Sequence, residues 1–87
     1  MRVLLDENLP HDLVSELDGL DVVTGHVAAF ITMDRKLERE HDLTELPFGV
    51  VVVRTRSNRV QDLRPLVGAI REALARSRPG RVEQVGA

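Results

Sequence analysis

The sequence contains no cysteine, tryptophan or tyrosine, and its only aromatic residues are Phe30 and Phe48. Without cysteine, the chain can form no disulfide, thiolate zinc site or cysteine nucleophile. Because aromatic side chains are so scarce, any binding of nucleic acid would rest on charge rather than on base stacking. No apolar run approaches the roughly 20 residues that span a bilayer, and the N-terminus has no signal-peptide pattern. These absences predict a cytoplasmic protein that does not contact a membrane.

The length and the distribution of charge indicate the number of domains and the kinds of ligand to expect. The 87 residues predict one domain, residues 1–87, with a small aliphatic core that a homodimer would help to stabilise. Residues 1–49 hold 11 acids against 4 bases, a balance of −7, whereas residues 50–87 hold 3 acids against 8 arginines, a balance of +5. An acidic half could bind a cation and an arginine half could bind phosphate. The alternative is that both are solvated helix faces.

Apolar runs alternate with helical patterns along most of the chain. The runs predict strands at residues 2–6, 20–24, 27–32, 49–54 and 81–85. Helices are expected after Asn8 as far as Gly19, over residues 34–43, and over an apolar pattern from Leu63 to Leu74 with Pro65 in its first turn. This alternation predicts a three-layer α/β/α domain with a mostly parallel sheet.

The connection between the second and third strands is too short for a helical crossover. Only a few residues around Gly25 and His26 separate the two apolar runs, whereas neighbouring parallel strands need a dozen or more. The runs could form an antiparallel hairpin, fuse into one strand over residues 20–32, or exchange between two molecules. We expect an exchanged or long-strand dimer first among these.

Acidic and polar residues follow two of the expected strands. Asp6, Glu7 and Asn8 come after the first strand, and Thr32 and Asp34 close the third. The carboxyl ends of parallel strands share one edge of a sheet, so Asp6 and Asp34 could hold one Mg²⁺ or Mn²⁺ ion. Glu7 could add a third carboxylate, and Asn8 and Thr32 could add neutral oxygens or hydrogen bonds. The alternative for both aspartates is helix capping at strand-to-helix turns.

Basic residues follow the strand of four valines. Arg54, Arg56, Asn58 and Arg59 would lie at the same edge as the acids, together with Arg35. Guanidinium is planar and always charged, so these side chains are candidates for binding the phosphates of RNA. Alternatively, they pair with the acidic half of the chain or of a second copy.

Three segments together resemble the small bacterial PIN-like proteins, which are often toxin-like partners in toxin–antitoxin pairs. They are residues 1–10 (MRVLLDENLP), 30–35 (FITMDR) and 46–54 (LPFGVVVVR). The resemblance implies an α/β/α fold with a central parallel sheet and a metal-dependent ribonuclease centre of clustered acids, two of which match Asp6 and Asp34. Such relatives usually carry a helical segment between the second and third strands, with a further acid near its start, and this chain has no such segment.

The resemblance therefore leads to two predictions. The first is a PIN-like, toxin-type ribonuclease that depends on Mg²⁺ or Mn²⁺ and has an incomplete acidic site. The alternative is a catalytically inactive remnant that forms a homodimer or binds an antitoxin-like protein.

Overall fold

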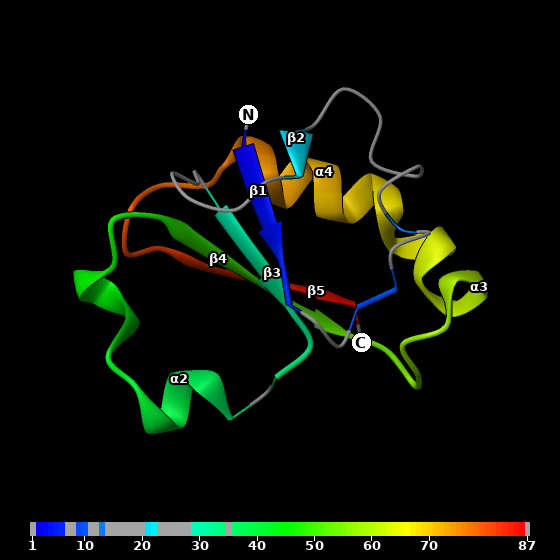
Figure 1. Ribbon diagram of the computed structural model, residues 1–87, viewed down its shortest axis with the longest axis horizontal. Helices are drawn as coiled ribbons and strands as arrows, with labels where there is room; N and C mark the ends of the chain where they lie inside the picture. The colour runs from blue at the N-terminus through cyan, green and yellow to red at the C-terminus, as the bar shows by residue number, and fades with distance from the viewer. Residues whose placement is uncertain are drawn as a thin grey trace.

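A five-stranded parallel sheet forms the centre of the protein (Figure 1). The computed structural model describes residues 2–6, 9, 10, 13, 21, 22, 29–34 and 36–86. Its strands are β1 (Arg2–Leu5), β2 (Asp21–Val22), β3 (Ala29–Thr32), β4 (Gly49–Arg54) and β5 (Val82–Gly86). Their order is β2-β1-β3-β4-β5, and every neighbouring pair is parallel. The prediction of a small α/β domain with a parallel sheet is confirmed.

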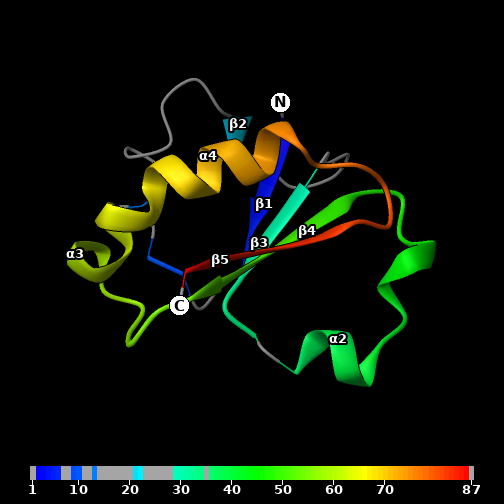
Figure 2. The same ribbon diagram turned by 180° about the vertical axis from the view of Figure 1, so that it is seen from behind.

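Helical segments follow β3 and β4 and lie on opposite sides of the sheet (Figure 2). After β3 come α2 (Leu37–Glu40) and the 3₁₀ turn η1 (Leu43–Glu45). After β4 come α3 (Val60–Leu63), the 3₁₀ turn η2 (Arg64–Leu66) and α4 (Val67–Ala75). Within the described residues, none of the helices has the length and apolar content that crossing a bilayer requires. The helix expected after Asn8 falls largely outside the described residues, which include only Leu9, Pro10 and Leu13 of it.

The two faces of the sheet bury different amounts of apolar surface. Side chains alternate between the faces along each strand. One face packs against α3 and α4 in a cluster of Val3, Leu9, Leu13, Ala29, Ile31, Val51, Val53, Leu63, Ile70, Ala73, Leu74 and Val85. The other face buries Leu43, Val50 and Val52, with Phe30, Leu37, Leu46, Phe48 and Val82 partly buried around them. The valines of β4 are thus buried on both faces, as is typical of an internal parallel strand.

The third helical region begins earlier than its apolar pattern predicts. Helical conformation starts at Val60, so Pro65 lies inside the region and not in its first turn. Proline has no backbone N–H and its ring crowds the preceding turn, and the chain adapts with the 3₁₀ turn η2 between α3 and α4. Ile70 and Leu74 are buried as their spacing predicts. The predicted start of this helix was wrong, whereas its buried face is confirmed.

Two short segments replace the helix expected over residues 34–43. His41 is extended at the end of α2, and Asp42 begins η1 by accepting hydrogen bonds from the hydroxyl (2.6 Å) and backbone N–H (3.1 Å) of Thr44. Local bonds of this kind compete with helix continuation, which explains the break. The bond from the Thr44 side chain, followed by that from its backbone, lowers the pKa of Asp42 below its ordinary value.

The second and third strands lie on opposite sides of β1. Val22 of β2 and Ala29 of β3 both pair with Val3. Because adjacent strands are about 4.8 Å apart, the two residues are separated by about 10 Å, and seven residues of chain can span more than 20 Å. The predicted hairpin and the predicted single long strand are therefore wrong. The connection also needs no exchange between chains, because Val22 and Ala29 lie level with each other on the two sides of Val3. A homodimer stays a prediction.

Candidate functional site

Two neighbouring strands bring Asp6 and Asp34 to the same edge of the sheet. Asp6 directly follows β1, and its backbone N–H extends the ladder by donating to the Ile31 carbonyl over 2.9 Å. Asp34 lies two residues beyond the end of β3. Because β1 and β3 are parallel neighbours, both aspartates lie where these strands end. This is the edge at which ligands bind in open α/β sheets.

The Thr32 hydroxyl connects the two aspartates. It donates a hydrogen bond to Asp6 Oδ2 over 2.6 Å and accepts one from the Asp34 backbone N–H over 3.0 Å. Thr32 is fully buried, so its hydroxyl must find partners within the protein. Of the two roles expected for Thr32, the structure shows the hydrogen bond: its side chain fixes the Asp6 carboxylate against the loop that carries Asp34.

Asp34 also organises the turn that leads into α2. Its Oδ1 accepts a hydrogen bond from the Lys36 backbone N–H over 2.9 Å, and its carbonyl accepts a longer one from Leu37 over 3.4 Å. The N-cap residue of α2 is Lys36 and no described side chain caps this helix, so Asp34 stabilises the turn before α2 and is not its helix cap. Among the described residues, no donor binds Asp34 Oδ2 or Asp6 Oδ1. Within the described part of the chain, one oxygen of each carboxylate therefore accepts no hydrogen bond.

The donor set suits a hard cation that is partly hydrated. Mg²⁺ is commonly bound by one or two carboxylates, with waters and substrate phosphates as the remaining ligands, and Asp6 and Asp34 supply such a pair. No group of three or more His, Cys, Asp or Glu side chains arranged for a metal occurs within the described residues. Glu7 and Asn8, which were expected to add oxygens, lie outside those residues, as does Arg35.

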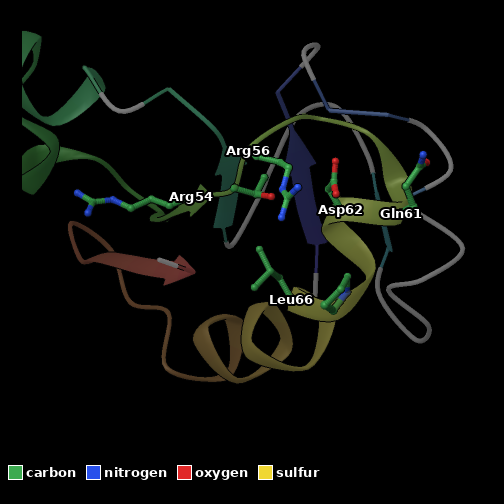
Figure 3. A pocket seen from close by; sticks show the side chains of 7 residues that line it. Arg54, Arg56, Gln61, Asp62 and Leu66 are labelled. Atoms are coloured by element: carbon green, nitrogen blue, oxygen red, sulfur yellow. The ribbon is translucent and has the colours of Figure 1, made fainter.

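The basic residues expected to bind phosphate surround the end of β4. Arg54 is its last residue and is half-buried, whereas Arg56, Asn58 and Arg59 are exposed in the loop that follows. A cavity of about 400 Å³ lies between this loop and the following helices, lined by Arg54, Thr55, Arg56, Gln61, Asp62, Pro65 and Leu66. Figure 3 shows the side chains of Arg54 and Arg56 leaving the end of the strand in opposite directions.

Two ion pairs between described residues lie within the basic half of the chain. Glu83 accepts from Arg81 (2.7 Å) and Arg76 (3.3 Å), which are both exposed. Neither Arg54 nor Arg56 forms an ion pair with a described carboxylate. In this part of the molecule, the arginines at the end of β4 therefore do not neutralise the acidic half.

Sequence reasoning missed a polar group formed by α2 and the end of the sheet. Gln84 of β5 donates from Nε2 to Glu38 Oε1 of α2 over 2.8 Å. These two residues line a second cavity, of about 470 Å³, together with Arg39 and Arg54. The paired segments are far apart in the sequence, and no local pattern indicates that they meet.

Comparisons with known proteins identify no relative of this chain. No family model, no curated protein and no solved structure matches the chain. The functional argument therefore rests on the residues and their geometry.

Proposed function

We propose that the protein is a PIN-like, toxin-type domain that cleaves RNA at a Mg²⁺ or Mn²⁺ ion held by Asp6 and Asp34. The observation that carries the proposal is the hydrogen-bonded connection from Asp6 through Thr32 to Asp34 at the ends of two parallel neighbours. The resemblance of residues 1–10, 30–35 and 46–54 to PIN-like proteins supports the same assignment.

The residues of this edge have separate tasks in the proposed reaction. A bound divalent ion lowers the pKa of a water molecule and offsets the charge that develops on the leaving oxygen. Asp6 and Asp34 would hold the ion, while the hydrogen bonds from Thr32 and Lys36 fix one oxygen of each carboxylate. Arg54 and Arg56, at the end of β4, hold the RNA backbone by its phosphates. Two carboxylates alone would not complete the set of ligands around the ion, and a phosphate of the substrate would supply further oxygen ligands.

The dependence of cleavage on metal tests this proposal. Purified wild-type protein is incubated with end-labelled single-stranded RNA, either with Mn²⁺ or Mg²⁺ or with excess EDTA. We expect cleavage with either cation and none with EDTA, because the carboxylates cannot activate water without the ion. Cleavage that persists in EDTA would contradict the proposal.

Absence of cleavage under every condition would instead favour the alternative function. In that case the chain is an inactive PIN-like remnant that forms a homodimer or binds an antitoxin-like protein. Light scattering at micromolar concentration then distinguishes a dimer from a monomer that needs a different partner.

A further inference from the structure

A polar pocket lies between α2 and the carboxyl ends of β4 and β5. It has a volume of about 470 Å³ and is lined by Glu38, Arg39, Arg54 and Gln84. Arg54 lies two residues after Val52 on β4, and Gln84 of β5 pairs with Val52. Both side chains therefore belong to the face of the sheet that carries the smaller apolar cluster. The pocket continues that face toward the edge where Asp6 and Asp34 lie.

The charges and hydrogen bonds of this pocket favour an anion. Among the described lining residues, two guanidinium groups face one carboxylate, and Glu38 already accepts a hydrogen bond from Gln84 over 2.8 Å. Arg54 Nε is excluded from solvent and has no hydrogen-bond acceptor among the described residues. A buried cationic N–H without an acceptor costs free energy, so a ligand that reorganises the Arg54 guanidinium and accepts from it is favoured.

We infer that this pocket binds a phosphate group of single-stranded RNA, adjacent to the phosphate that is cleaved. The inference rests on the proposed function, because RNA is the substrate class of that function. Guanidinium presents several donors in a fixed fork that matches phosphate oxygens. The lining contains no aromatic side chain on which a base could stack. The pocket is therefore suited to the RNA backbone and not to a base.

The position of the pocket relative to the acids supports this assignment. Thr32, which binds Asp6, pairs with Val52, two residues before Arg54. Adjacent strands are about 4.8 Å apart, so the end of β4 lies about 10 Å from the end of β1. One RNA strand running along this edge can thus reach both the metal-binding acids and the pocket.

Binding of inorganic phosphate in EDTA tests the pocket without any cleavage. In NMR titrations of the wild-type protein, we expect phosphate to shift the Arg54 Nε–H and the Gln84 side-chain amide. Arg39→Ala removes an exposed cation and should weaken phosphate binding about 5- to 10-fold. Glu38→Gln removes the nearby negative charge and should strengthen phosphate binding about 3-fold. Arg71→Ala is the matched control, because Arg71 is exposed on α4, which packs on the opposite face.

Equal phosphate affinities in the Arg39, Glu38 and Arg71 variants would overturn the inference, as would shifts confined to another part of the protein. A short fluorescent oligoribonucleotide, also in EDTA, then tests the source of the phosphate. The slope of log affinity against log salt should decrease by about 0.7 for Arg39→Ala and stay unchanged for Arg71→Ala. Inorganic phosphate binding without this change in slope would contradict the assignment to RNA.

The two proposals fail separately. If Arg39→Ala weakens binding in EDTA but the wild type cleaves no RNA with Mn²⁺, the pocket stands and the ribonuclease proposal fails. If the wild type cleaves RNA with Mn²⁺ and Arg39→Ala binds it normally, the ribonuclease stands and the pocket fails.

Discussion

The Asp6→Asn variant is expected to lose at least about 100-fold of the RNA-cleaving activity measured with Mn²⁺, because it removes one of two carboxylates proposed to bind the ion. The amide oxygen of asparagine can still accept the hydrogen bond that the Thr32 hydroxyl donates to Asp6 Oδ2. The local structure should therefore persist while the negative charge is lost. Initial cleavage rates over a range of Mn²⁺ concentrations measure the effect.

Asp42→Asn is the control for this substitution. Asp42 is an exposed aspartate that accepts hydrogen bonds from Thr44 at the start of η1, remote from the carboxyl edge of the sheet. Its replacement should leave the cleavage rate within about 2-fold of wild type, as expected of a surface substitution outside the site. Equal rates for Asp6→Asn and wild type would exclude Asp6 from the reaction.

The Ile70→Ala variant is expected to lose about 2–5 kcal/mol of unfolding free energy. Ile70 of α4 is fully buried in the larger apolar cluster, against Val51 and Val53 of β4 among others. Truncation leaves a cavity there and removes apolar contacts, and small domains have only about 5–15 kcal/mol to lose. Urea denaturation followed by circular dichroism measures the change in midpoint.

Glu72→Ala, two residues along the same helix, provides the comparison for Ile70. Glu72 is exposed, so its replacement should change stability by no more than about 0.5 kcal/mol. A loss below about 1 kcal/mol for Ile70→Ala would mean that α4 does not pack on β4 as described. Equal losses in the two variants would lead to the same conclusion.

Local sequence patterns were sufficient to predict most strands of the sheet. Four consecutive valines predicted β4 with its observed bounds, and the apolar run before Asp6 predicted β1. Such runs are informative because an internal parallel strand is buried on both faces. The positions of Asp6 and Asp34 at one edge followed from the same argument, since parallel strands end at a common edge.

The connection from β2 to β3 was misjudged because the two strands were taken to be neighbours in the sheet. The requirement for a dozen or more connecting residues applies to neighbouring parallel strands, whereas β1 lies between β2 and β3. Strand order, which the sequence does not reveal locally, decides this point.

Local patterns likewise could not predict the hydrogen-bond partners of the site residues. Thr32 and Asp6 are 26 residues apart in sequence, and Gln84 and Glu38 are 46 apart. Their contacts depend on strand order and on the placement of α2 beside β5. The residue types at the acidic edge could therefore be predicted, whereas the hydroxyl that links the acids and the polar pocket required the structure.

Paramagnetic broadening by Mn²⁺ in amide NMR spectra tests most directly whether Asp6 and Asp34 share one ion. At low Mn²⁺ concentration, we expect the backbone amides of Asp6, Thr32 and Asp34 to broaden first in the wild type. This local broadening should disappear in Asp6→Asn and remain in Asp42→Asn. Broadening that centres on other acids, or that is the same in wild type and Asp6→Asn, would contradict a shared metal site at the ends of β1 and β3.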